Sequence, residues 1–252
     1  MIGNITLNNC RNRQNLTFSG KSFVEVKLLG EKFLVPKKVA DVRRSVKYVF
    51  AEDENSCYLS NAVNLKNKLF IGIAHFGDCF KKISELNIGK INNNKEADFS
   101  VNPVKKHIKN KKLDLSIFNI EMPEKWQIAK STPIKIAEKP PKAGETVYVV
   151  GYHPDFKGPK TIPATYKGLS KSNISANDEY GASSEYFEIT SDVLKNRINP
   201  TCLSGAAIVN NNGELIGIQK KGMTDYGKSD GSFFGISIDT VKKYLKEVNI
   251  SV

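Results

Sequence analysis

Short apolar runs rich in valine, isoleucine and phenylalanine alternate along the chain with turns rich in glycine, asparagine and proline. Runs of this length, bounded by turn residues, are typical of strands in an all-β barrel or sandwich. The runs that we expect as strands are Ser22–Leu29, Val46–Ala51, Cys57–Val63, Lys68–Ala74, Leu113–Ile120, Pro133–Ala137, Thr146–Gly151, Glu185–Thr190, Ala206–Asn210, Leu215–Gln219 and Phe233–Ile238.

Helical spacing is rare, and the clearest case closes the chain. Four apolar residues recur there at i, i+3, i+4 and i+7, which predicts a C-terminal α-helix. They are Val241, Tyr244, Leu245 and Val248. Asp239 is placed to cap the first turn of this helix. A weaker pattern predicts a short helix over Val39–Ser45.

The polar, proline-interrupted segment Lys125–Lys142 divides the predicted strands into two similar groups, so it is the best internal boundary. Residues 1–38 form an N-terminal extension with a predicted hairpin, in which the turn Gly30-Glu31 joins Phe23–Leu29 to Lys32–Val35. Two further segments, Lys81–Lys112 and Ser170–Ser184, are rich in Asn, Lys and Ser and are expected as surface loops.

Composition places the chain among ordinary globular proteins. Of its 252 residues 40% are hydrophobic, which excludes disordered, collagen-like and coiled-coil classes. The longest apolar stretches, Leu69–Phe76 and Val147–Tyr152, are far shorter than the ~18 residues that span a bilayer. Polar residues interrupt the N-terminus before an apolar region can form. We therefore expect a cytoplasmic protein, or one exported without a Sec-type signal peptide.

The chain is strongly basic, with 38 Lys+Arg against 26 Asp+Glu, a net charge of +12 and a pI of about 9.4. Such a charge suits nucleic acid. The lysines, however, are scattered among asparagines, and neither an RNP-type aromatic run nor a helix-turn-helix pattern occurs. These features argue against nucleic-acid binding. The sequence carries no signal for an oligomeric state.

The four cysteines are too sparse for a disulfide scaffold, and no CxxC pair offers the spacing of a zinc site. Cys57 and Cys79 flank the same predicted strand, so they could form one bridge in an oxidising compartment. Reduced thiols are the preferred interpretation, and we expect no metal.

Candidate catalytic residues lie at the ends of predicted strands. Ser204, followed by Gly205, lies on a tight loop that enters a hairpin, so its hydroxyl and N–H face one side. A serine nucleophile needs a general base and a group that orients that base. His75 ends the apolar strand Leu69–Ala74, and Asp114 begins the next alternating strand. Of the other histidines, His107 lies among lysines in an expected loop and His153 in a turn.

These residues, in this order, resemble the trypsin-like, chymotrypsin-fold serine proteases, nearest the bacterial and HtrA-like branch. The resemblance covers roughly residues 40–248 and rests on Ala74-His75, on Asp114–Phe118, and on Ser204-Gly205 with the hairpin Gly213–Ile218. It implies two antiparallel six-stranded β-barrels with a C-terminal α-helix, the first in residues 39–132 and the second in residues 133–252. It also implies peptide-bond hydrolysis of a protein or peptide substrate, without a cofactor.

The resemblance further assigns the site. His75, Asp114 and Ser204 would form the catalytic triad, and the backbone N–H groups of Cys202 and Ser204 the oxyanion hole. The substrate pocket would be lined by Ile198, Gln219, Lys220 and Lys221. Because position 198 carries no carboxylate, recognition of Lys or Arg is disfavoured. Either lysine at 220 and 221 could instead attract an acidic side chain.

Two departures keep other functions open. Cys202 stands where the family usually has glycine, so its backbone could be strained and the hole misformed at rest. Leu203 replaces the aspartate of zymogen-activated enzymes, which removes support for activation by a new N-terminus. The alternative is a pseudoprotease that acts as a protein-binding module. A Cys202 nucleophile is disfavoured, because it lies two residues too early in the loop.

Overall fold

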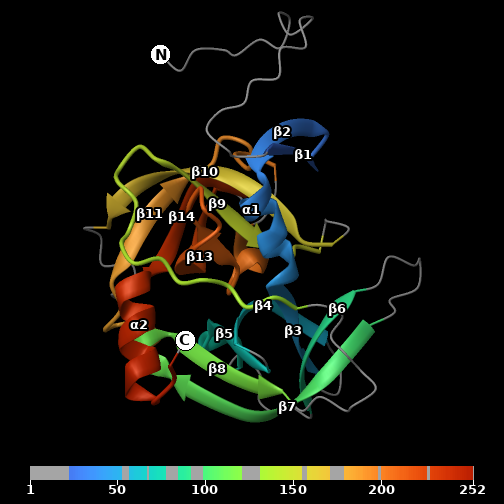
Figure 1. Cartoon of the computed structure of the whole chain (residues 1–252), viewed down its shortest axis with the longest axis vertical. Helices are drawn as coiled ribbons and strands as arrows, with labels where there is room; N and C mark the ends of the chain where they lie inside the picture. The colour runs from blue at the N-terminus through green and yellow to red at the C-terminus, as the bar shows by residue number, and fades with distance from the viewer. Residues whose placement is uncertain are drawn as a thin grey trace, which may run out of the picture.

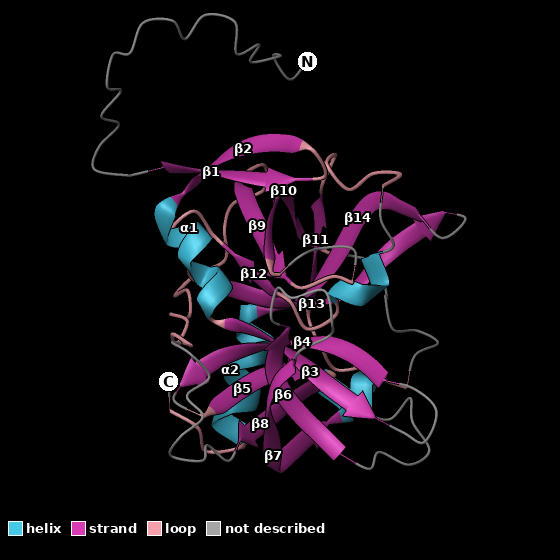
Figure 2. Cartoon of the chain, turned by 90° about the vertical axis from the view of Figure 1, so that its right-hand side faces the viewer, coloured by secondary structure: helices cyan, strands magenta, loops and turns pink. Residues whose placement is uncertain are grey.

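The computed structural model describes residues 23–52, 57–66, 68–77, 85–91, 99–120, 131–154, 158–170, 179–197, 200–225 and 228–251. Their strands form two closed six-stranded barrels stacked end to end, with a two-stranded hairpin at the far side of the second barrel (Figures 1 and 2). The predicted all-β class, with two antiparallel six-stranded barrels and a C-terminal helix, is confirmed.

The first barrel has the strand order β3-β4-β5-β8-β7-β6, closed by antiparallel pairing of β3 with β6. Its strands are β3 (Val46–Glu52), β4 (Cys57–Lys66), β5 (Leu69–Ile73), β6 (Glu85–Ile91), β7 (Phe99–Asn110) and β8 (Leu115–Ile120).

The second barrel has the order β10-β11-β14-β13-β12-β9, closed by antiparallel pairing of β9 with β10. Its strands are β9 (Thr146–Gly151), β10 (Lys160–Leu169), β11 (Tyr186–Thr190), β12 (Ala207–Val209), β13 (Leu215–Asp225) and β14 (Lys228–Ser237).

A hairpin and a short helical segment precede the first barrel. β1 (Phe23–Leu28) pairs with β2 (Glu31–Pro36), and α1 (Lys37–Asp41) continues into the 3₁₀-helix η2 (Val42–Arg44). Leu28 packs into the core of the second barrel, which anchors the hairpin there. The short helix expected over Val39–Ser45 is therefore present, beginning two residues earlier.

The barrels share one apolar interior where they meet. A single cluster of buried side chains includes Tyr48 and Phe70 from the first barrel together with Tyr152 and Ile218 from the second. A separate cluster around Phe187 and Phe233 fills the second barrel. Burial stabilises by roughly 25 cal/mol per Å² of apolar surface, so the shared cluster favours docking of the barrels in one arrangement.

The C-terminal helix α2 (Ile238–Glu247) lies against both barrels, with Val241, Tyr244 and Leu245 buried as the sequence predicts. The Tyr244 hydroxyl donates to the carbonyl of Ile108 on β7 at 2.8 Å. The expected cap was wrong: Ser237 is the N-cap, and its hydroxyl accepts from the N–H of Thr240 at 3.2 Å. Asp239 lies one residue inside the helix, in the first turn.

The sequence analysis also assigned one loop wrongly and missed one strand. The expected loop Lys81–Lys112 contains β6 and β7, because the barrel supplies each of them with a strand on both sides. On β7, Val104 and Ile108 pack on the core while Lys105 and Lys109 are exposed. β10 went unpredicted because Pro163 and Gly168 break its pattern.

The segment expected as a strand over Pro133–Ala137 is instead a connection that makes a single parallel bridge, between Ile136 and Leu215. Its backbone still bonds to β13: Ala137 N–H donates to the Leu215 carbonyl at 2.9 Å, and Leu215 N–H to the Lys135 carbonyl at 2.8 Å. Prolines on either side limit the strand, since proline cannot donate to a ladder.

The same connection is held by an ion pair at the surface. Lys135 Nζ lies 2.6 Å from Glu214 Oε1, and the hydrogen bond from Lys135 is the main cause that lowers the pKa of Glu214 below its ordinary value of 4.5. Because a depressed carboxyl pKa stabilises the fold above the unfolded-state value, this contribution is lost as pH falls through the folded-state pKa.

Replacing Glu214 by glutamine is therefore expected to lower stability at neutral pH by no more than about 1 kcal/mol, since Lys135 is exposed. Thermal melts of both proteins across pH 3–8 measure the effect. The difference in Tm should shrink towards acid pH. A difference that stays constant over this range would contradict the assignment.

Candidate active site

Asp114 is aimed by the turn that precedes β8. The 3₁₀-helix η4 (Lys111–Leu113) begins with Asn110, whose side chain accepts from Leu113 N–H at 3.1 Å, and ends at Asp114 in the left-handed conformation. Aspartate tolerates this conformation, with φ of 52° and ψ of 38°, better than most residues. The turn buries the carboxylate completely, against the end of β5.

His75 follows β5 and begins the 3₁₀-helix η3 (His75–Gly77). Asp114 Oδ1 accepts from the backbone N–H groups of Ala74 and His75 at 3.1 and 2.9 Å, and Oδ2 lies 2.8 Å from His75 Nδ1. An ionised carboxylate only accepts, so Nδ1 carries the hydrogen and Nε2 is left as the basic nitrogen. With 28% of the imidazole exposed, His75 is oriented and still accessible.

Ser204 is held between the two barrels. It follows the 3₁₀-helix η5 (Pro200–Leu203), and its carbonyl accepts from the N–H of Asn61 and the hydroxyl of Ser60, both at 2.9 Å. Its own hydroxyl donates to the carbonyl of Lys220 on β13 at 3.1 Å. Strand β4 of the first barrel thus fixes the serine loop of the second.

Asn61 is a residue that the sequence analysis missed. Its side-chain nitrogen donates to the carbonyls of Tyr152, Cys202 and Ser204 at 3.2, 3.4 and 3.3 Å, and its oxygen accepts from Tyr152 N–H at 2.7 Å. A buried amide with this many partners specifies one arrangement. The polar pair Ser60-Asn61 within an otherwise apolar predicted strand was the available signal.

Gly205 allows this close approach. Its φ is +80°, and a Cβ at this position would overlap the carbonyl of Asn61. Its N–H donates to the Gln219 carbonyl at 2.8 Å, and the N–H of Gln219 donates to Ala206 at 2.9 Å. The small residue after Ser204, which the sequence analysis noted for the turn, is therefore also required by contact between the barrels.

Two tyrosines lie close to the serine loop. The rings of Tyr48 and Tyr152 are 4.1 Å apart, and burial raises the pKa of Tyr152 to about 12. Burial also raises the pKa of Tyr48, with smaller contributions from Tyr152 and Cys202. Both rings are therefore neutral near pH 7, and they bring no charge to the loop.

The residues expected to line the substrate pocket are placed differently from one another. Gln219 is fully buried, and neither polar atom of its side chain has a hydrogen-bond partner among the described residues. Lys220 is buried with its ammonium 3.2 Å from Asp114 Oδ2, whereas Lys221 is exposed. Ile198 lies outside the described residues.

The Cys202 backbone does not show the expected strain at rest. Cys202 lies within η5 and is not among the described residues with positive φ. Its thiol is free. The bridge considered between Cys57 and Cys79 involves side chains outside the described part of the chain.

The other two histidines lie on different elements. His107 is on β7 rather than in a loop, where its ring stacks on Phe118 at 4.7 Å and its Nε2 lies 3.0 Å from Ser116 Oγ. The sequence analysis placed His107 in a loop because it missed β7, which is ordered by pairing with β6 and β8. His153 is buried in the connection after β9, close to the turn predicted for it.

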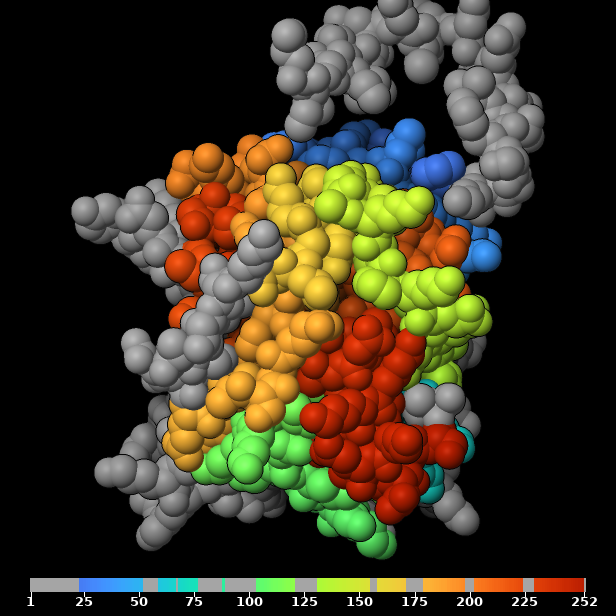
Figure 3. Space-filling view, turned by 90° about the vertical axis from the view of Figure 1, so that its left-hand side faces the viewer, coloured from blue at the N-terminus to red at the C-terminus, as the bar shows by residue number. Residues whose placement is uncertain are grey.

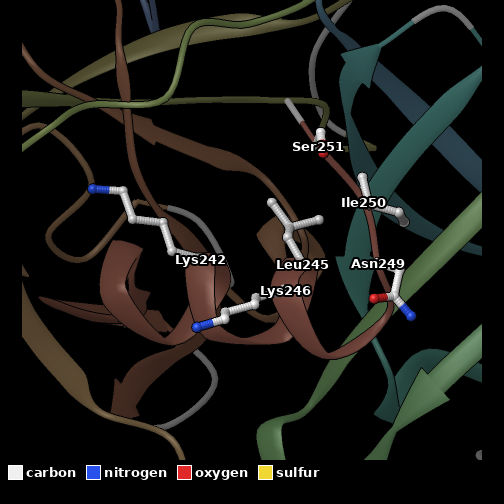
Figure 4. A pocket seen from close by; sticks show the side chains of 6 residues that line it. All are labelled: Lys242, Leu245, Lys246, Asn249, Ile250 and Ser251. Carbon is white, nitrogen blue, oxygen red and sulfur yellow. The ribbon is translucent and has the colours of Figure 1, made fainter.

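A pocket of about 650 Å³ opens beside α2, and none of the candidate catalytic residues lines it. Lys242, Leu245 and Lys246 line one side, and the segment 249–251 lines the other (Figure 4).

Within the ranges that the structure describes, no group of His, Cys, Asp and Glu side chains could hold a metal ion. No helix in those ranges is long and apolar enough to cross a membrane.

Comparison with known proteins identifies the family of the chain. A model of the trypsin-like peptidase domain matches residues 55–218, which include His75, Asp114 and Ser204. The chain belongs to the trypsin-like peptidase family. No curated protein matches it. By membership of this family the chain is a peptidase, and its substrates are proteins or peptides.

Solved structures share the fold of this trypsin-like peptidase at low sequence identity. The active form of the Rv3671c protease from M. tuberculosis is 15% identical, with a TM-score of 0.64 over 85% of each chain. Its inactive form is 16% identical, with a TM-score of 0.61 over 84% of this chain and 92% of that one. The HtrA-type protease AlgW with tripeptide is 14% identical, with a TM-score of 0.63 over 84% of this chain and 62% of AlgW.

Proposed function

We propose that this trypsin-like peptidase is a serine endopeptidase that works through an acyl-enzyme. The observation that carries the proposal is the contact of 2.8 Å between His75 Nδ1 and Asp114 Oδ2. This contact places the ring hydrogen on Nδ1, so that Nε2 is the basic nitrogen. Nε2 takes the proton of the Ser204 hydroxyl as its oxygen attacks the scissile carbonyl. When the C–N bond breaks, the imidazolium gives this proton to the leaving amine and the acyl group stays on Ser204. Water, deprotonated by Nε2 in the same way, then releases the acyl group as a carboxylic acid and returns the proton to Ser204. Asp114 stabilises the imidazolium that forms, and no metal or cofactor takes part.

The Ser204 hydroxyl also has a partner on β13. At rest it donates to the Lys220 carbonyl at 3.1 Å, and a hydroxyl can rotate to donate to an imidazole instead. Asn61 and Ser60 hold the serine carbonyl, so this rotation needs no movement of that carbonyl. The carbonyl of Ser204 therefore stays in place while its hydroxyl oxygen becomes the nucleophile.

Replacing Ser204 by alanine tests the proposal. We expect cleavage of an unfolded protein substrate to fall to background, while Ser183→Ala, which alters an exposed serine, leaves cleavage unchanged. Residual cleavage by the Ser204 variant at more than a few per cent of the wild-type rate would contradict the assignment of the nucleophile. Thermal melts establish that both variants are folded.

The oxyanion hole of this enzyme is expected to form on substrate binding. In a 3₁₀-helix each N–H is directed at the carbonyl three residues earlier, and Cys202 is the third of the four residues of η5. Its N–H is thus directed into the turn rather than at a substrate. The proposed donors, Cys202 and Ser204, become available together only when the turn opens; one such donor is worth roughly 2.7–4 kcal/mol of barrier.

Cys202→Gly is therefore expected to raise kcat/KM several-fold on a given peptide. Glycine weakens a helical turn by roughly 0.5–1 kcal/mol relative to alanine and permits positive φ. Steady-state kinetics and thermal melts of the variant and the wild type measure the effect. An unchanged or reduced kcat/KM in a folded variant would contradict the closed-loop interpretation and leave the triad assignment standing.

The same helical turn is the observation that favours the second candidate function, a pseudoprotease that binds proteins. In that case the turn never opens, and the His75–Asp114 pair would be structural. A protein that binds an unfolded substrate without cleaving it under any condition, in the wild type as in Ser204→Ala, would support this function.

A further inference from the structure

Lys220 places a buried positive charge on the same carboxylate oxygen that orients His75. Its Nζ lies 3.2 Å from Asp114 Oδ2, and His75 Nδ1 lies 2.8 Å from that atom. Both the lysine and the aspartate side chains are almost fully buried, with 2% and 0% exposed. Two cationic or hydrogen-bonding groups from different barrels therefore share one oxygen of Asp114.

The Lys220 ammonium has two further contacts besides Asp114. Nζ donates to the carbonyl of Tyr180 at 2.7 Å and lies 5.6 Å from the centre of the Tyr186 ring, within the range of a cation–π interaction. A Cβ on Gly181 would come within 3.0 Å of Nζ and would overlap the Tyr186 hydroxyl. The backbone at Gly181 thus closes over the lysine.

This cover joins the two barrels. The N–H groups of Gly181 and Ser183 donate to the carbonyls of Lys111 and Lys112, each at 2.8 Å, and the Ser184 hydroxyl donates to Leu113 at 2.6 Å. In Figure 3 the orange segment of the second barrel lies against the green segment of the first at this place. The segment 179–184 therefore packs on the turn that aims Asp114.

Lys220 also contacts the serine, through its backbone. Its carbonyl accepts from the Ser204 hydroxyl at 3.1 Å, while its ammonium contacts Asp114. One residue of β13 thus touches two members of the proposed triad. Its side chain is directed at the acid.

We propose that Lys220 is a positioning residue that sets the charge balance of the His75–Asp114 pair. A buried ammonium beside Asp114 offsets part of the attraction between the carboxylate and a protonated imidazole, because like charges a few ångströms apart repel strongly away from water. His75 then stays neutral, and basic, at lower pH than it would beside Asp114 alone. The inference rests on the proposed serine-protease function and extends it to the pH range of activity.

Among the described residues, an ion pair of the same cover also lies close to this site. Lys111 Nζ lies 5.3 Å from the Tyr180 ring and is paired with Glu179 at 3.1 Å, and both side chains are exposed. The ring of Tyr180 faces His75 edge-on at 6.1 Å. The Lys111–Glu179 pair is neutral overall and screened by solvent, so it has little effect on the charge of His75. The test therefore removes the charge of Lys220.

Lys220→Met removes the ammonium and keeps an unbranched side chain. Asp114 retains the N–H groups of Ala74 and His75 and the imidazole, so the variant is expected to fold. We expect the acid limb of its kcat/KM profile to move to higher pH by about one unit, with less than a tenfold change on the plateau. For acidic and for neutral peptides alike, the KM of the variant should equal that of the wild type.

Lys47→Met is the matched control, because Lys47 is also buried and donates to the Arg44 carbonyl at 3.1 Å in the first barrel. Its profile should match that of the wild type. An acid limb that is the same in wild type and Lys220→Met, or that moves equally in both variants, would overturn the proposal. A KM increase confined to acidic peptides would also overturn it and assign Lys220 to substrate binding.

Two measurements that need no catalysis separate this proposal from the proposed function. The NMR titration of the His75 ring should move to higher pH by about one unit in Lys220→Met. Asp114→Asn, which leaves the buried ammonium without its counter-charge, should lower Tm by about 10 °C, and adding Lys220→Met should restore most of that loss. An inactive wild type that shows both effects would refute only the protease; an active one that shows neither would refute only the role of Lys220.

Discussion

Replacing His75 by alanine is expected to lower kcat by about 10⁴-fold or more, the scale on which triads lose activity when their base is removed. The reason is geometric: His75 is the histidine whose Nδ1 lies 2.8 Å from a buried carboxylate, and its ring is 28% exposed. Single-turnover kinetics on a peptide substrate measure the change without interference from product release.

His107→Ala is the matched control for this prediction. His107 stacks on Phe118 and contacts Ser116 on the first barrel, so its loss should lower stability and leave kcat within a few-fold. Equal losses of kcat in the two folded variants would contradict the assignment of His75 as the general base.

The second large effect is expected at Gly205. Alanine there would require a left-handed backbone at φ of +80° and would press its methyl group against the Asn61 carbonyl. That carbonyl belongs to a central strand, which cannot move without disturbing the hydrogen bonds to Ser204. We expect Gly205→Ala to lose several kcal/mol of stability, about 10 °C or more in Tm, and most of its activity.

Gly144→Ala separates the two causes. Gly144 has a φ of +90°, but nothing lies within 4 Å of a Cβ placed on it. Its substitution should cost only the backbone term, on the order of 1 kcal/mol. If thermal melts show equal losses for both variants, contact between the serine loop and β4 is not what requires glycine at position 205.

The sequence predicts most of the strands because their local pattern is strong. The strands β3, β5, β8 and β9 are apolar runs between turn residues, and each was expected within one or two residues of its observed bounds. The strands β6 and β7 were missed, because their sequences, rich in polar residues, contain no clear apolar run and their order comes from pairing within the barrel.

The site shows the same division. His75, Asp114 and Ser204 could be picked out because each lies beside a predicted strand and their chemistry is specific. Asn61 and the ammonium of Lys220 could not be placed, because their partners come from the other barrel, up to 143 residues away along the chain for Asn61 and Ser204. Sequence distance hides contacts that only packing of the two barrels creates.

The central claim is that Ser204 is a nucleophile activated by His75. Reaction of the intact protein with a fluorophosphonate, followed by peptide mass mapping, tests it most directly, because this reagent phosphonylates an activated serine. We expect one label per chain, on Ser204, that is lost in His75→Ala. A folded protein that remains unlabelled at Ser204 with and without a substrate peptide, or that is labelled equally in His75→Ala, would contradict the claim.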